Sequence, residues 1–77
     1  MKALADLTVS EVCGLLKKVN LSKLVEVFTS NEVSGMMLSF CDTAAELQSE
    51  EIGVTSALVA KGLIKLIGEW KERGVPL

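Results

Sequence analysis

The stretch from Thr55 to Arg73, TSALVAKGLIKLIGEWKER, decides the fold, because its spacing predicts one long amphipathic helix. Either Thr55 or Ser56 is placed to cap its start, and Gly74 followed by Pro76 is typical of a helix end. At about 100° per residue, one face gathers Val59, Leu63, Leu66, Ile67 and Trp70. The opposite face gathers Ala57, Lys61, Lys65, Gly68 and Glu72, with Leu58 and Ile64 on its shoulders. We expect the first face to be buried and the second to be exposed.

Four shorter helices are predicted before this one. The first starts at Thr8, whose side chain and that of Glu11 match a capping box, in which each satisfies a free backbone N–H group. Its apolar side chains recur at spacings of three and four residues: Val9, Val12, Leu16 and Val19. The second helix begins near Ser22, and its inward side chains are Leu24, Val25 and Phe28.

The third and fourth helices are short and are predicted mainly from their capping residues. Ser34 is placed to cap the segment GMMLSF, and Thr43 with Glu46 repeats the capping-box pattern. Gly53 then interrupts the chain before the long helix. The sequence therefore predicts an all-α fold, a five-helix bundle with four short helices and a long C-terminal helix. It forms a single domain over residues 1–77, with a core from about residue 7 to 73.

Composition excludes several classes of protein. With 77 residues, 49% of them hydrophobic and 1 of them proline, the chain suits one compact domain better than disorder. Its net charge of -2 argues against a nucleic-acid binder, which usually has a basic patch. No stretch approaches the roughly 20 apolar residues of a membrane helix, and Asp6 interrupts the apolar run that a signal peptide needs. We expect an intracellular, cytoplasmic protein or a piece of a larger one, with a nuclear location also open.

No catalytic, metal or cofactor site is predicted. The chain has no histidine, so a serine or cysteine nucleophile would lack its usual base. Cys13 and Cys41 are too few for a disulfide scaffold and too isolated for a metal site, and we expect free thiols. The acids between positions 42 and 50 are interpreted as a solvated face, and Leu47 stands where an EF-hand loop would need glycine. The chain is predicted not to be an enzyme.

Charge is segregated along the chain. Residues 24–60 hold six acids and no lysine or arginine: Glu26, Glu32, Asp42, Glu46, Glu50 and Glu51. Residues 1–23 and 61–77 each carry four basic residues and two acids. The net charges of the first, middle and last segments are therefore +2, -6 and +2, which sum to the total of -2. This separation would let the acidic middle of one molecule meet the basic helix of another. The alternatives are that the lysines form an ordinary solvated face and that the acids keep an apolar domain soluble.

The sequence resembles the sterile alpha motif (SAM) domain family over about residues 7–70. The segment LTVSEVCGLLKKVNL is similar to the opening of that family, and LVEVF, ending at Phe28, is similar to its second helix. VSGMML matches the turn and leucine pair of the family through Val33, Gly35, Met37 and Leu38. EEIGVTSALVAKGLIKLI resembles the run into the long fifth helix through Ile52, Gly53 and Val54.

This resemblance implies a non-catalytic protein-interaction module, expected within a scaffold or signalling protein. In the family, the start of the fifth helix forms an end-helix surface and the acidic middle forms a mid-loop surface. The two surfaces join head to tail in homo- or hetero-association with another SAM-like domain. Carried over, the end-helix surface would consist of Val54, Leu58, Lys61, Ile64 and Lys65. The mid-loop surface would consist of Asp42, Glu46, Glu50 and Glu51.

Other functions stay open as alternatives. Some SAM domains bind RNA or DNA through a basic cluster, and Lys17, Lys18 and Lys23 lie near one another here, although the acidic total argues against it. A basic amphipathic last helix would attract a lipid surface only weakly, because it offers two or three lysines. A small acidic carrier protein would need an attachment serine in an Asp-Ser-Leu-like context, and neither NLSKL nor VSGMM supplies one.

Overall fold

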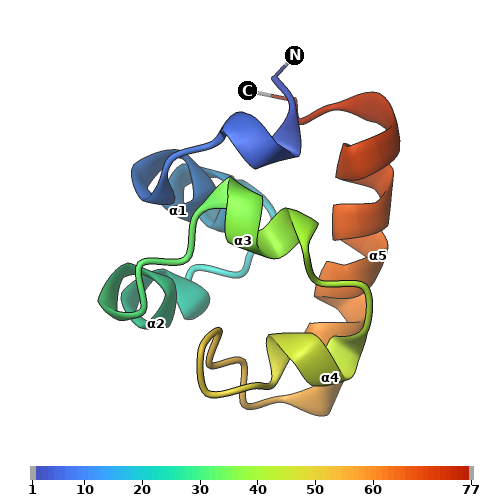
Figure 1. Cartoon of the computed structure of the whole chain (residues 1–77). Helices are drawn as coiled ribbons and strands as arrows, with labels where there is room; N and C mark the ends of the chain where they lie inside the picture. Colours follow the sequence, from blue (N-terminus) through green and yellow to red (C-terminus); the bar gives the residue numbers. More distant parts are fainter. Residues whose placement is uncertain (1, 77) are drawn as a thin grey trace.

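The long helix α5 (Ala57–Arg73) runs along one side of the molecule, and the shorter helices pack beside it (Figure 1). The computed structural model describes residues 2–76. The shorter elements are the 3-10 helix η1 (Leu4–Asp6) and the helices α1 (Val9–Lys18), α2 (Leu24–Ser30), α3 (Gly35–Ser39) and α4 (Ala44–Leu47). The prediction of an all-α fold with four short helices and a long last helix is confirmed.

The predicted capping residues start four of the helices. At α1, the Thr8 hydroxyl accepts a hydrogen bond from the Glu11 N–H, and the Glu11 carboxylate accepts one from the Thr8 N–H, with N···O distances of 3.2 and 3.0 Å. The Thr8 N–H, and after it the Lys2 ammonium, lower the pKa of Glu11. Ser34, Thr43 and Ser56 each accept a backbone N–H bond at the starts of α3, α4 and α5. These bonds satisfy N–H groups that have no partner within a helix.

The core lies between the inner face of α5 and the short helices. Leu63, Ile67 and Trp70 of α5 are buried as predicted, and Ala60 joins them. Val59 and Leu66, which we also expected on this face, lie at its margin and are only partly buried. Fully buried side chains from the short helices and from the connection between α2 and α3 complete the core, chiefly Val12, Leu15, Leu16, Phe28, Val33, Leu38 and Leu47.

The packed region extends beyond the predicted limits of residues 7 and 73. Lys2 and Val75 form an isolated antiparallel bridge, with N···O distances of 3.2 and 2.7 Å, so both ends of the described chain lie together (Figure 1). Leu4 of η1 and Val75 are both buried. Gly35 allows η1 to approach α3, because a Cβ at that position would collide with the Leu4 carbonyl oxygen.

The turn before α5 has a backbone geometry that favours glycine. Gly53 has a φ of 90°, in the left-handed region that other residues rarely adopt. Beside it, the Asn31 side-chain amide at the end of α2 donates to the Ile52 carbonyl oxygen at 3.2 Å. The Val54 N–H then donates to the Leu47 carbonyl oxygen at 3.0 Å, which ties the turn to α4. The direction in which α5 starts is therefore fixed by contacts with α2 and α4.

Candidate interaction surfaces

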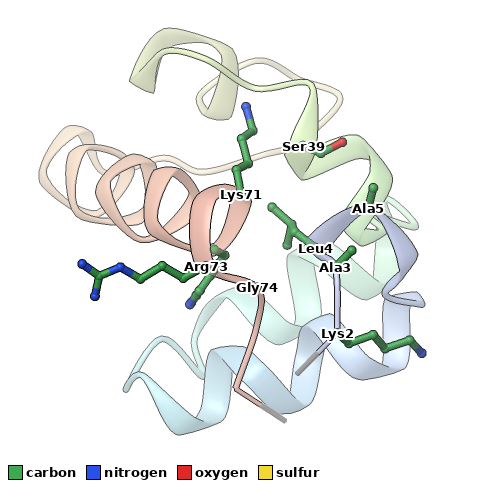
Figure 2. A pocket seen from close by; sticks show the side chains of 9 residues that line it. Lys2, Ala3, Leu4, Ala5, Ser39, Lys71, Arg73 and Gly74 are labelled. Atoms are coloured by element: carbon green, nitrogen blue, oxygen red, sulfur yellow. The ribbon is translucent and has the colours of Figure 1, made fainter.

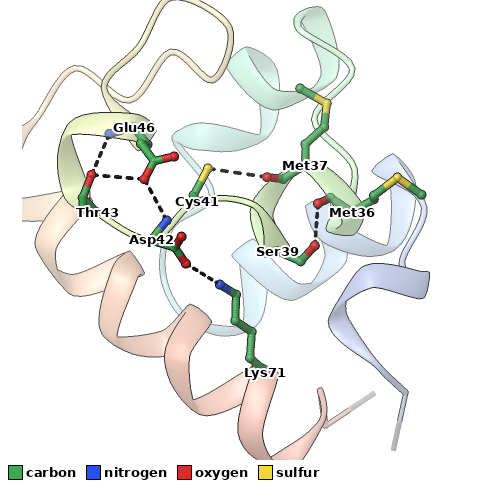
Figure 3. A network of polar contacts seen from close by, with 8 residues as sticks. All are labelled: Met36, Met37, Ser39, Cys41, Asp42, Thr43, Glu46 and Lys71. Carbon is green, nitrogen blue, oxygen red and sulfur yellow. Dashed lines mark hydrogen bonds and ion pairs between the residues drawn. The ribbon is translucent and has the colours of Figure 1, made fainter.

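The acidic residues of α4 and its flanks are organised by the Thr43 cap. The carboxylate of Glu46 accepts hydrogen bonds from the Asp42 N–H at 3.0 Å and from the Thr43 hydroxyl at 3.3 Å (Figure 3). Glu46 thus bonds the N–H one residue earlier than a regular capping box would. The carboxylate is held in place and remains exposed to solvent.

A hollow of about 220 Å³ lies beside these acids. Its rim includes Glu46 and Glu51, and its apolar wall includes Met37, Phe40 and Ile52. The Phe40 side chain is 69% exposed, an unusual position for a large aromatic residue. We call Phe40 together with Asp42, Glu46, Glu50 and Glu51 the acidic surface.

The four predicted mid-loop residues are all exposed, but they are not equivalent. Glu46 and Glu51 share the rim of the hollow, whereas Glu50 lies in the turn after α4. Asp42 is paired within the molecule, because its carboxylate accepts from the Lys71 ammonium at 3.1 Å (Figure 3). An exposed pair of this kind contributes under about 1 kcal/mol. Asp42 is therefore partly neutralised, and Glu46 and Glu51 carry the free charge of the hollow.

The two cysteines are free thiols, as expected. Cys41 is buried beneath the acidic surface, and its Sγ donates to the Met37 carbonyl oxygen at 3.5 Å. Burial raises the pKa of the Cys41 thiol, and the nearby Glu46 carboxylate raises it further. A nucleophilic cysteine needs a lowered pKa. The surroundings of Cys41 therefore disfavour the thiolate and do not activate it as a nucleophile. Cys13 is half-buried, with its Sγ 3.3 Å from the Thr29 hydroxyl oxygen.

The basic residues predicted on α5 lie on its outer face. Leu58, Lys61 and Lys65 are all exposed, and their spacing of three and four residues places them side by side. Leu58 is 79% exposed. Neither lysine forms an ion pair with a carboxylate in the part of the chain that the structure describes. We call Leu58, Lys61 and Lys65 the basic surface.

Two residues predicted for the end-helix surface are not part of the basic surface. Val54 is 1% exposed and belongs to the core, so its assignment as a contact residue is wrong. Ile64 is partly buried and packs against the core. Ile64 precedes Lys71 by two helical turns and so faces the side on which Lys71 meets Asp42. Both residues support the helix instead of presenting a side chain to a partner.

A second hollow, which the sequence did not reveal, lies along the other side of α5. This groove of about 350 Å³ is formed between α5 and the connection from α1 to α2. All of its lining residues are apolar or glycine: Val19, Leu21, Leu58, Val59, Gly62, Leu63 and Leu66. Leu58 therefore belongs both to the basic surface and to the edge of the groove.

The groove and the acidic surface lie on different sides of α5. Leu66 lines the groove and Lys71 contacts Asp42. A separation of five residues rotates a side chain by about 140° around a helix. A single molecule therefore cannot bring its own acidic surface against its own groove without unfolding.

A larger hollow of about 390 Å³ near the paired chain ends has a basic rim but does not form an anion site. Its cationic residues are Lys2, Lys71 and Arg73, and Figure 2 shows these side chains projecting in different directions. Lys2 is paired with Glu11 at 3.0 Å, and Lys71 with Asp42 at 3.1 Å. The three charges do not converge on one point.

Residues 2–76 contain no group of histidine, cysteine or carboxylate side chains suited to holding a metal ion. Within the same range, no helix is both long and apolar enough to cross a membrane. Comparisons with protein-family models, with curated proteins and with solved structures gave no match. The two charged surfaces and the hollows beside them are therefore the features of the molecule that point to a function.

Proposed function

We propose that this chain is a non-catalytic protein-interaction module of the SAM type, in which an acidic surface binds a basic surface of another molecule. One observation carries the proposal. Each surface combines unpaired charges of one sign with a large exposed apolar side chain, Phe40 on the acidic side and Leu58 on the basic side.

Both components are needed for association. Exposed ion pairs are worth under about 1 kcal/mol each, so Lys61 and Lys65 would mainly select and orient a partner. Burial of apolar area contributes about 25 cal/mol per Å², and Leu58 and Phe40 offer such area. Opposite charges around apolar anchors are the arrangement expected of a specific contact.

The resemblance to the SAM family is consistent with this arrangement. The acidic surface comes from the segment that matches the mid-loop side of the family, and the basic surface comes from the start of the long helix. Membership of that family and a place in a scaffold or signalling protein are parts of the same proposal.

The proposal is tested by reversing charge on the basic surface. Lys61→Glu combined with Lys65→Glu should weaken association, measured by light scattering from micromolar to millimolar concentration, and leave thermal melting nearly unchanged. Lys2→Glu combined with Arg73→Glu makes the same change of charge near the paired chain ends and should leave association intact. Reversal of Glu50 and Glu51 to lysine should restore binding when that variant is mixed with the Lys61/Lys65 variant.

Each alternative result has a distinct meaning. If the wild type associates and the Lys61/Lys65 reversal associates equally well, charge complementarity is wrong. A wild type that keeps one molecular mass over the whole range leaves only a foreign partner for the module.

A further inference from the structure

We propose that the groove beside α5 receives Phe40 of a second copy of this chain, so that the module assembles with itself through an aromatic anchor. This inference rests on the proposed function and adds the identity of the partner and of the anchoring residue. It starts from the groove, whose volume is about 350 Å³ and whose lining carries no polar side chain. A cavity of about 150 Å³ already holds a benzene ring, so the groove has room for a phenylalanine side chain.

Phe40 fits the role of anchor by its position. It follows the last residue of α3 and is 69% exposed, whereas Phe28, the other phenylalanine, is fully buried in the core. Aromatic side chains that enter a pocket on the partner dominate the energetics of many interfaces. Phe40 presents such a side chain without any need to disturb the core.

The charges around the two features are complementary. Phe40 shares the wall of its hollow with Glu46 and Glu51. The groove is bordered by Leu58, which lies next to Lys61 and Lys65. Entry of Phe40 into the groove would therefore bring free carboxylates toward free ammonium groups. The same approach would bring Leu58 toward the acid-rimmed hollow of about 220 Å³, so that each surface offers one protruding side chain and one recess.

The partner must be another molecule. The groove and the acidic surface lie on different sides of α5, so Phe40 cannot reach the groove of its own chain. The contact joins two unlike patches, which makes it heterologous, and such a contact adds copies in a row or closes a ring.

Two helical glycines, one on α5 and one on α1, provide a test of the groove with a matched control. Gly62 lines the groove, whereas Gly14 is exposed on α1 and belongs neither to the groove nor to either charged surface. A Cβ at either position meets no atom within 4 Å, so both positions accept a larger residue. Gly62→Met should fill the groove and weaken self-association at least about tenfold, the effect expected when an anchor is lost. Gly14→Met should leave self-association within about twofold of the wild type, and both variants should remain folded because methionine favours helix more than glycine does.

Phe40 is tested in the same way from the acidic side. Phe40→Ala should weaken self-association at least about tenfold. Met36→Ala removes another exposed large side chain from α3, 54% exposed, and should have little effect. A mixture of Phe40→Ala and Gly62→Met should then form a 1:1 dimer and stop there. The first variant keeps its groove, and the second keeps its phenylalanine.

Analytical ultracentrifugation of the full chain, from micromolar to millimolar concentration, decides between the outcomes. A wild type that stays monomeric overturns the proposal that the partner is a second copy. If the monomer also sediments with phosphatidylserine vesicles and Gly62→Met abolishes that binding, the groove binds a lipid surface and the proposal is equally wrong. If the Lys61/Lys65 reversal prevents assembly but Phe40→Ala and Gly62→Met do not, the anchor is wrong while the proposed function stands. If none of these variants changes assembly, both proposals fail.

Discussion

The acidic and basic surfaces are built on very different supports. The acidic surface lies at the end of α3, on α4 and in the turn after it, and these helices have 5 and 4 residues, whereas the basic surface lies on α5, which has 17. Helices of one turn are not stable by themselves, because ordering the backbone of the first turn costs more conformational entropy than its one hydrogen bond offsets. The acidic surface therefore depends on its local caps together with the burial of Leu38 and Leu47, whereas the basic surface depends on core contacts along the whole of α5. We therefore expect the acidic surface to open locally and the basic surface to be lost only when the domain unfolds.

The largest expected effect tests the support of the basic surface. Leu63→Ala removes a fully buried side chain from the inner face of α5 and should lower the free energy of unfolding by about 2–5 kcal/mol. Leu58→Ala makes the same change on the outer face, where the side chain is 79% exposed, and should alter stability by less than about 0.5 kcal/mol. Urea unfolding measures both, and equal losses would contradict the assignment of the two faces.

A smaller effect tests the local support of the acidic surface. Thr43→Ala removes the α4 cap and should cost about 1 kcal/mol. It should also speed alkylation of Cys41 by iodoacetamide, which we expect to be slow in the native chain because the thiol is buried and its pKa is raised. Mass spectrometry follows the labelling.

Ser56→Ala is the matched control for this cap. It removes the cap of α5 at a similar cost, but its effect should appear in global unfolding with little local exposure of Cys41. If both variants label Cys41 at the same rate, the acidic surface does not open separately from the rest of the domain.

The smallest expected effect is an increase in the free energy of unfolding. Gly68→Ala replaces an exposed glycine within α5 at a site where a Cβ meets no atom within 4 Å. It should raise the free energy of unfolding by about 0.5–1 kcal/mol, since alanine favours a helix more than glycine does. Association should not change. A weaker complex would mean that the partner packs against the face of α5 that carries Lys61 and Lys65 so closely that an added methyl group is excluded.

The sequence was sufficient for the helices because their signals are local. Thr8, Ser34, Thr43 and Ser56 cap the backbone within a few residues, and the buried residues of α5 recur at helical spacing. It failed at the chain ends, since the burial of Leu4 and Val75 depends on a bridge between residues far apart in sequence.

The candidate site was predictable only in its charges. Lys61 and Lys65 lie on the outer face as their spacing predicts. Val54 was misplaced, because a position just before a helix has no periodicity to reveal burial. The spacing of four residues between Met36 and Phe40 puts both on one side of α3, but only the packing of η1 onto α3 determines that this side is exposed. The groove needs two segments to meet, so no single stretch could predict it.

The bridge between Lys2 and Val75 holds the two ends of the described backbone next to each other, so that the chain nearly forms a ring. A few glycine and serine residues would span that gap, and new ends could then be cut at an exposed turn such as Glu50–Glu51. Domains whose ends meet in this way tolerate circular permutation and can be inserted into a loop of a host protein. Inserted in this way, the domain would be attached to its host at the paired chain ends, and the end of the molecule farthest from them would be directed away from the host.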